Sequence, residues 1–364
     1  MRNDGVAFDT RITWPLLQLK YLLDEIAPWL VRPFMAMTMT KEVINAAARS
    51  EPVLKGSGDS WAARRKRTER RLREDWRILP SVGMEESFPV VQEDFIPALR
   101  RGEIAPVHGF KDFAGERSVL LADGTVLEDV DAVIFCTGYS LDFAMFPDLE
   151  FDGACGMPLR TAGEESGNDC KAKPLHIPRL YQMMFPPKWA SSIAILSWFS
   201  PLESRWSSLE LASMALAQIW AAETAKTTPE LRKLPKAPNY RPPAILPSLD
   251  EMNAQIDAYH AWARKDRERG YPTREGFMQV YPFYRFLHNA AGTAMYENLD
   301  HFFTGRGWAL WWRDPELWRW LAKGPLNNYG YRLFDTNPEG IPGCGRRIWH
   351  GARQAVEDCV SDPA

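Results

Sequence analysis

The chain has 364 residues, of which 45% are hydrophobic and 25% charged, with a formal net charge of −3. These proportions are typical of a globular protein and exclude a disordered one. Because there is no basic excess, no nucleic-acid partner is expected.

The cysteine count and the N-terminus favour an intracellular protein. The five cysteines form no C-x-x-C pair, so neither a metal site nor a disulfide framework is expected. The opening residues do not form a signal peptide, no N-x-S/T sequon occurs, and no run of eighteen apolar residues could span a bilayer. The prediction is an intracellular protein, cytoplasmic or peripheral to an internal membrane.

Residues 15–47 are predicted to be helical, with breaks at Pro28 and Pro33. A broad apolar face is formed by Leu16, Leu17, Leu19, Leu22, Leu23 and Ile26. We favour a helix that packs into the core; the alternative is an amphipathic helix in peripheral contact with a membrane surface.

Residues 61–77 carry a dense set of charges. The basic ones are Arg64, Arg65, Lys66, Arg67, Arg70, Arg71 and Arg73, and the acidic ones are Glu69, Glu74 and Asp75. We favour a solvated helix with internal ion pairs. The alternative is a site for a nicotinamide cofactor that carries a 2′-phosphate.

Residues 104–138 are predicted to form a short β-meander. Asp123-Gly124 is a strong hairpin signal between two apolar runs. Asp131–Cys136 follows, and its apolar run predicts a buried parallel strand. The strand ends in Thr137-Gly138-Tyr139, where a glycine allows close approach of a flat or charged ligand. A nucleotide-binding sheet needs this at the carboxyl ends of its strands.

A second short buried strand is predicted at Ile193–Leu196, followed by a turn at Pro201 into a helix. Ser204, Ser207 and Ser208 are candidates for its N-cap. A helix that starts just beyond a strand end directs the positive end of its dipole at any ligand in the crevice.

Six prolines between residues 229 and 247 predict an irregular connection. A helix is then expected from the capping box Ser248–Glu251 to Gly270. Asp314-Pro315-Glu316 is a further helix start. The tryptophan-rich stretch 308–320 is interpreted equally well as an interface or as internal packing.

No complete catalytic or phosphate-binding motif is present. Gly56-Ser-Gly58 and Gly343-Cys-Gly345 each lack the third glycine of G-x-G-x-x-G and are expected to be loops. The sequence also lacks G-x-x-x-x-G-K, G-x-S-x-G and H-E-x-x-H, and its histidines have no ligand spacing. No catalytic residue is therefore assigned, although a Ser/His/Asp set need not be local.

The order of several short segments between residues 90 and 353 is similar to that of a known family. They are Leu121–Val126, Phe135–Tyr139, Leu180–Pro187, Asp314-Pro315, Tyr331–Leu333 and Trp349–Arg353. In this order they resemble the D-G-T turn, the F-A-T-G-Y strand end, the L-Y-x-x-x-F-P stretch and the C-terminal end of flavin-containing monooxygenases of the dimethylaniline monooxygenase type. Cys136 replaces the alanine of the second motif.

The resemblance implies an α/β fold with two dinucleotide-binding domains, here incomplete, with partial Rossmann-like sheets, the β-meander and a helical C-terminal extension. Residues 1–103 would be a mainly helical remnant of the nicotinamide-binding domain. Residues 104–226 would hold the meander and the returning part of the FAD domain, and residues 227–364 the Pro-rich connection and helical extension. The expected cofactors are FAD and NADPH, near Thr137, Gly138, Tyr139, Pro201 and Ser204.

The implied activity is oxygenation of a soft nitrogen or sulfur nucleophile in a small molecule. The family's two glycine-rich fingerprints and its F-x-G-x-x-x-H motif are missing from this sequence. Since these fingerprints hold the cofactor phosphates, tight binding by the chain alone is not expected. The alternatives are a truncated non-catalytic paralogue or incomplete gene model that acts at most as an interaction partner, and a related Baeyer–Villiger oxygenase.

Overall fold

The computed structural model describes most of the chain. The described residues are 2–3, 6–7, 12–54, 59–80, 94–136, 143–164, 176–196, 198–200, 205–227, 246–269, 276–300, 307–338 and 345–361. The structure divides into two compact units, apart from Met1. Unit 1 comprises residues 35–82 and 89–142, and unit 2 comprises residues 2–34, 83–88 and 143–364. The division into residues 1–103, 104–226 and 227–364 stays a prediction.

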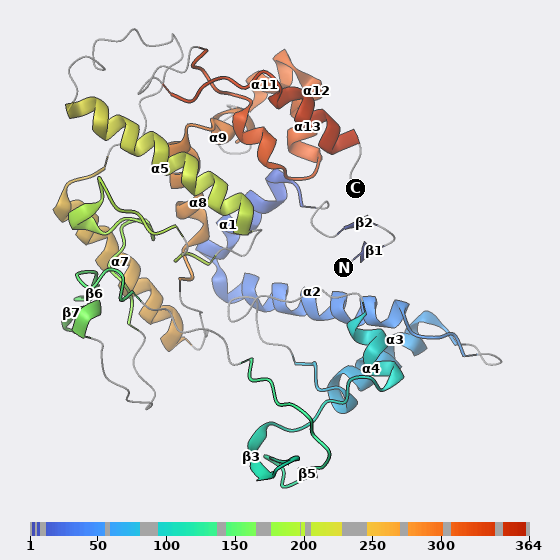
Figure 1. Ribbon diagram of the computed structural model, residues 1–364. Helices are drawn as coiled ribbons and strands as arrows, with labels where there is room; N and C mark the ends of the chain where they lie inside the picture. Colours follow the sequence, from blue (N-terminus) through green and yellow to red (C-terminus); the bar gives the residue numbers. More distant parts are fainter. Residues whose placement is uncertain are drawn as a thin grey trace. The chain divides into compact units, whose positions relative to one another are not determined.

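The fold is a mixture of helices and small sheets, which fits the predicted α/β class (Figure 1). The predicted partial Rossmann-like sheets are not among the described strands, whose pairs are all antiparallel. The helices are α1 (Trp14–Ile26), α2 (Pro28–Arg49), α3 (Trp61–Arg70), η2 (Arg71–Asp75), α4 (Phe95–Arg101), η3 (Ala162–Glu164), η4 (Pro187–Trp189), α5 (Arg205–Thr227), α7 (Leu249–Glu268), α8 (Val280–Ala291), α9 (Met295–Leu299), α11 (Trp308–Arg313), α12 (Pro315–Lys323), η5 (Asn328–Arg332) and α13 (Ala352–Ser361). The strands are β1 (Arg2–Asn3), β2 (Val6–Ala7), β3 (Phe110–Gly115), β4 (Ser118–Leu121), β5 (Val126–Leu127), β6 (Glu150–Asp152) and β7 (Leu159–Thr161). All strand pairs among them are antiparallel.

Helix starts follow the local chemistry of the sequence. Ser248 and Glu251 form the predicted capping box of α7, each side chain accepting from the other's backbone N–H. Asp314 caps α12 by accepting from the backbone N–H of Leu317 at 3.0 Å. Ser207 and Ser208 lie inside α5, so the prediction that either caps this helix is wrong.

The segment predicted at residues 15–47 forms two helices, because α2 begins at Pro28; Pro33 lies inside it. The inner side of α1 is formed by Trp14, Leu17 and Tyr21. Its other apolar side chains remain exposed: Leu16, Leu19, Leu23 and Ile26. Packing into the core therefore accounts for only part of the predicted apolar face.

Unit 2 is built around a large apolar core. Helix α8 packs against both α5 and α1. Phe185, Leu211 and Leu287 are completely buried there, and Tyr21 stacks on Tyr284 with ring centroids 5.3 Å apart. Burial of this kind stabilises a fold by roughly 1.5–3 kcal/mol for each large apolar side chain.

A tight turn at residues 181–185 lies inside this core. Tyr181 and Phe185 pair through both backbone hydrogen bonds, of 2.7 and 2.9 Å. Gln182 and Met183 adopt left-handed conformations with φ of 51° and 59°. Because neither is glycine, the turn carries backbone strain, and burial of Met183 and Phe185 offsets it.

The tryptophan-rich stretch divides between the two interpretations. Trp320 is buried against the core of unit 2, whereas Trp308, Trp311 and Trp312 are exposed. Trp311 contacts both Trp308 and Trp312 edge to face along α11.

Unit 1 has a small apolar cluster and a meander. The cluster contains Ile44, Ala47, Leu72 and Leu79. The predicted hairpin at Asp123-Gly124 is confirmed, because β4 and β5 pair on either side of it, with Val119 opposite Leu127. Gly124 takes a φ of 88°, as such a turn requires.

The prediction of a buried strand at Asp131–Cys136 is wrong. The segment follows β5 without joining its sheet, and all six residues are exposed. Ile134 is 84% exposed and Phe135 56%. A parallel strand needs a hydrogen-bonded neighbour and cover on both faces, and the described residues supply neither.

The prediction of a second buried strand at Ile193–Leu196 is also wrong. These residues are half-buried and irregular. The N–H of Ile195 donates to the carbonyl oxygen of Met184 at 2.8 Å, and that of Ile193 to Trp189 at 2.8 Å. The chain here is held by turn contacts with the preceding segment, which the apolar pattern alone did not indicate.

Candidate functional site

The predicted cofactor-binding residues lie next to segments that the structure describes. Thr137, Gly138, Tyr139, Pro201 and Ser204 are themselves outside the described residues. The exposed segment 131–136 ends immediately before the first three, and α5 begins immediately after Ser204. Their role therefore stays a prediction.

The first turn of α5 is held in place by contacts with two tyrosines. The hydroxyl of Ser208 is hydrogen-bonded to that of Tyr284 at 2.6 Å, and both residues are buried. Tyr284 is in turn stacked on Tyr21 of α1. The start of α5 is thus fixed to α8 and α1 by polar and aromatic contacts.

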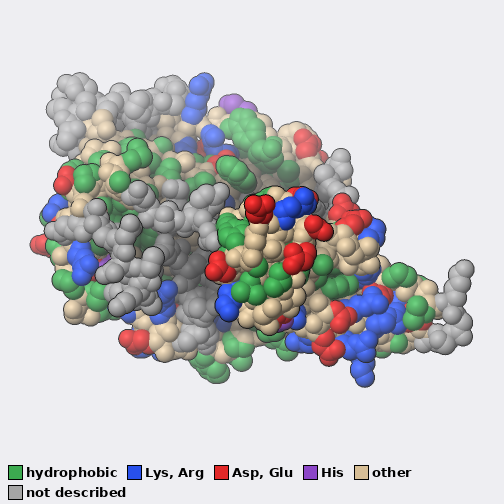
Figure 2. Space-filling model, turned by 60° about the horizontal axis from the view of Figure 1, so that its bottom comes forward, with side chains coloured by type: hydrophobic (Ala, Val, Ile, Leu, Met, Phe, Trp, Pro, Cys, Tyr) green, Lys and Arg blue, Asp and Glu red, His purple; other side chains and the backbone are tan. Residues whose placement is uncertain are grey.

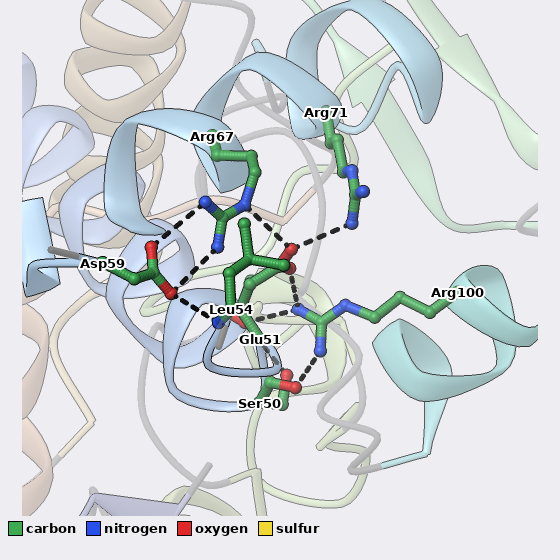
Figure 3. A network of polar contacts seen from close by, with 8 residues as sticks. Ser50, Glu51, Leu54, Asp59, Arg67, Arg71 and Arg100 are labelled. Atoms are coloured by element: carbon green, nitrogen blue, oxygen red, sulfur yellow. Dashed lines mark hydrogen bonds and ion pairs between the residues drawn. The ribbon is translucent and has the colours of Figure 1, made fainter. Parts of the chain in front are cut away.

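Unit 1 contains a buried carboxylate surrounded by guanidinium groups (Figure 3). Glu51, only 5% exposed, follows the C-terminus of α2. Its carboxylate lies 2.8 Å from Arg100, 3.0 Å from Arg71 and 3.3 Å from Arg67. We call these four residues, with Asp59, the Glu51 network.

Arg100 and Asp59 extend the network to the backbone. Arg100 donates to the carbonyl oxygens of Ala47 at 2.8 Å and of Ser50, and so caps the end of α2. Asp59 accepts from Leu54 N–H at 2.9 Å and from Arg67 at 3.2 Å. These bonds, the backbone one first, hold the pKa of Asp59 below its usual range.

The preferred interpretation of residues 61–77, a helix with internal ion pairs, is confirmed. Beyond the Glu51 network, Arg73 pairs with Glu69 at 3.0 Å, and Arg70 lies 4.0 Å from Glu74. The face shown in Figure 2 has Lys and Arg interspersed with Asp and Glu. Arg67, Arg70, Arg71 and Arg73 are thus paired with carboxylates of the protein itself.

A second buried charge cluster lies in unit 2 and was missed by the sequence reasoning. Asp152 is fully buried and lies 2.6 Å from Nδ1 of His176 and 2.8 Å from Arg264. Arg179 donates to the backbone oxygen of Asp152 and to Asp257, each at 2.7 Å. The residues of this Asp152 cluster are up to 112 positions apart in the sequence, so no spacing pattern could have indicated the cluster.

Two buried histidines also belong to unit 2. Burial lowers the pKa of His260 to about 4 and that of His288 to about 3. His288 bonds to Thr293 at 2.8 Å and meets Trp14 edge to face at 5.1 Å. Both side chains are neutral packing residues near pH 7.

The described residues do not form a cradle for a nucleotide diphosphate. The glycines that pack most closely, Gly276 and Gly324, lie against the backbone of Trp198 and Trp320 and leave no room for a ligand. Gly124 and Gly292 face open space but belong to a hairpin and a helix end. A phosphate cradle needs a glycine-rich turn that leads into a helix, so the described part does not fit FAD or NADPH by itself.

No group of three or more metal-binding side chains occurs within the described ranges. In the same part of the chain, no helix combines the length and apolar character needed to cross a bilayer.

Comparison with known proteins shows which family part of the chain resembles. Residues 36–152 match the model of the flavin-binding monooxygenase-like family. The matched range includes the Glu51 network, the meander and the segment that ends in Thr137-Gly138-Tyr139. The match covers less than half of the chain, and this part is similar to the flavin-binding monooxygenase-like family.

Individual relatives agree with this assignment. The chain is 29% identical to monooxygenase aurF of Gibberella zeae over 78% of its own length and 47% of that protein. It is 26% identical to dimethylaniline monooxygenase [N-oxide-forming] 2 of Mus musculus over 74% of its length and 39% of the relative. It is 23% identical to flavin-containing monooxygenase 3 of Homo sapiens over 78% of its length and 41% of that relative. The matches thus span less than half of each relative.

Proposed function

We propose that the chain contributes to an FAD- and NADPH-dependent monooxygenase that oxygenates a soft nitrogen or sulfur nucleophile in a small molecule. The observation that carries the proposal is the family match across residues 36–152. In this reaction NADPH provides two electrons, one atom of dioxygen is transferred to the nucleophile, and the other leaves as water. The cofactors supply that chemistry, and the protein positions them.

The cofactor sites proposed within this chain lie next to residues 131–136 and to the start of α5. Thr137, Gly138 and Tyr139 would lie near the junction of the two nucleotide-binding parts, and Pro201 and Ser204 would face the flavin ring. The anchored first turn of α5 supports the second assignment, because it fixes the end of the helix that follows Ser204. No general acid or base is assigned.

The experiment is a spectroscopic and kinetic assay of the purified chain with added FAD and NADPH. N,N-dimethylaniline serves as the nitrogen probe and a thioether as the sulfur probe. Oxygenated product, with NADPH consumed in equal amount, would support the function. Oxidation of NADPH without product would contradict it.

A non-catalytic interaction partner is the alternative, and the lack of a diphosphate cradle among the described residues favours it. Sequencing the transcript separates the two. An upstream in-frame exon that encodes G-x-G-x-x-G would favour the enzyme, whereas an in-frame stop codon before Met1 would favour the partner.

We also propose peripheral contact with an internal membrane through α1. Leu16, Leu19, Leu23 and Ile26 are exposed and repeat at helical spacing. Burial next to Asp24 raises the pKa of the neighbouring Glu25, which lowers the cost of bringing it to a bilayer. Ile26→Glu should reduce co-sedimentation with phospholipid vesicles, and Met145→Glu, also at an exposed apolar position, should not. Equal binding by both variants and the parent would contradict the contact.

A further inference from the structure

The Glu51 network contains more guanidinium groups than carboxylates. Arg67, Arg71 and Arg100 converge on Glu51 (Figure 3). The other carboxylate is that of Asp59, which pairs with Arg67 at 3.2 Å. One carboxylate pairs fully with one guanidinium group, through two parallel hydrogen bonds. Because three arginines share two carboxylates, one positive charge of the network is in excess.

Arg64 adds a second excess charge beside the network. It lies three positions before Arg67 on α3, and its positive charge acts on Asp59. Its guanidinium group lies over the ring of Trp61, 5.5 Å from the centroid. Among the described residues, no carboxylate lies within ion-pair distance of Arg64. The network and Arg64 therefore carry two positive charges that the described part of unit 1 does not balance.

Some guanidinium donors in this part of unit 1 also have no acceptor. The Nε atoms of Arg64, Arg65 and Arg100 are buried, and no described residue accepts a hydrogen bond from them. Buried polar groups are nearly always hydrogen-bonded, and an exception indicates a bound ion or water. Burial first, and then the positive charge of Arg71, lower the pKa of Arg100 against the opposing effect of Glu51. An anion at this place would supply acceptors and reduce the repulsion.

A ligand can reach the cluster from solvent. The side chain of Arg71 is 36% exposed and that of Arg67 is 22% exposed, and Arg64 is half-buried. Guanidinium groups present planar forks of donors that match the oxygens of a phosphate group. A phosphate group carries a charge of about −1.5 to −2 near pH 7, which balances an excess of two positive charges. A carboxylate ligand would balance only one of them.

We propose that these arginines form a binding site for a phosphate group, with Arg71 and Arg100 at its centre and Arg64 at its edge. The ligand would bind beside Glu51 and join the same elements that the Glu51 network joins, the end of α2, α3, η2 and α4. Binding to the folded chain would therefore stabilise unit 1. The site goes beyond the proposed function, because it takes no part in the oxygenation and its binding is measured without turnover.

The test is a calorimetric titration of the full chain with inorganic phosphate, against chloride at equal ionic strength. We expect one phosphate to bind per chain and to raise the temperature at which unit 1 unfolds. Arg71→Gln should weaken binding about tenfold, because it removes a charged donor. Arg64→Gln should weaken it about threefold, and this variant leaves no carboxylate unpaired. Lys66→Gln is the matched control: it removes the same charge from an exposed position of α3 and should weaken binding less than about twofold.

Glu51→Gln should have the opposite effect on binding. It frees guanidinium donors, so phosphate should bind about fivefold more tightly and restore part of the stability that this variant loses. The proposal is overturned if phosphate binds no better than chloride, or if the Arg71, Arg64 and Lys66 variants weaken binding equally. Weaker phosphate binding by Glu51→Gln would also overturn it.

Two further probes distinguish the sources of the phosphate group. Competition by glycerol 3-phosphate would identify a soluble phosphate monoester, and competition by vesicles that contain phosphatidic acid would identify a lipid headgroup. If neither competes, the ligand is free phosphate. If adenosine 2′-phosphate binds and inorganic phosphate does not, the arginines recognise the nicotinamide cofactor, and the proposal of a separate phosphate site is overturned.

Discussion

The two units are held together in different ways. In unit 2 the described core contains completely buried apolar side chains from α5 and α8 and from the turn at residues 181–185. In unit 1 the apolar cluster is small, and the Glu51 network joins the end of α2 to α3, η2 and α4. Unit 2 therefore combines an extensive apolar core with the buried Asp152 cluster, whereas unit 1 has little apolar core and depends more on the Glu51 network.

The largest expected effect is on the core of unit 2. Phe185→Ala should lower the free energy of unfolding by about 3–5 kcal/mol, because it removes a fully buried ring and leaves a cavity. Urea unfolding followed by circular dichroism measures this. A loss below about 1 kcal/mol would mean that packing at the turn contributes little, and the contrast between the units would fail.

Glu51→Gln tests whether the Glu51 network stabilises unit 1. It should lower the free energy of unfolding of unit 1 by about 2–4 kcal/mol, since it leaves three guanidinium groups without their central carboxylate. Glu69→Gln is the control, because its ion pair with Arg73 is exposed and contributes about 0.3–0.5 kcal/mol. If the two variants are equally stable in unfolding measurements, the Glu51 network is not what holds unit 1.

The pH dependence should separate the units with a smaller effect. His260 and His288 of unit 2 have folded pKa values of about 4 and about 3, below the usual 6.5, so the unfolded chain binds more protons between these values. Stability is therefore fully present above pH 6.5 and is lost as the pH falls. Between pH 7 and pH 5 each histidine should cost unit 2 about 2 kcal/mol.

Thermal unfolding at the two pH values measures this loss. His288→Gln, which keeps a polar group beside Thr293, should reduce the pH dependence of unit 2 by about half. An unchanged dependence would show that these histidines are not buried in neutral form.

The parts that could be predicted from the sequence are those determined by local chemistry. The capping box at Ser248, the cap at Asp314 and the Asp123-Gly124 turn depend on neighbouring residues, and all three are confirmed. The strands at 131–136 and 193–196 were wrong because an apolar run indicates burial but not a pairing partner. The Asp152 cluster and the Glu51 network were missed because they join residues distant in sequence.

The candidate site shows the same limit. The resemblance to flavin-containing monooxygenases could be inferred from short ordered motifs, and the comparisons confirm the resemblance. The predicted cofactor-binding residues Thr137, Gly138, Tyr139, Pro201 and Ser204 remain predictions, because they lie outside the described residues.

The strained turn at Gln182 and Met183 has a consequence for the folding pathway. Neither residue favours a left-handed backbone, so the isolated segment should not form this turn before the surrounding core is in place. Its contacts would then be absent from the folding transition state. Mutations in the turn should accelerate unfolding and leave the rate of folding nearly unchanged, so that the residues 181–185 govern how long the native state lasts once it is reached.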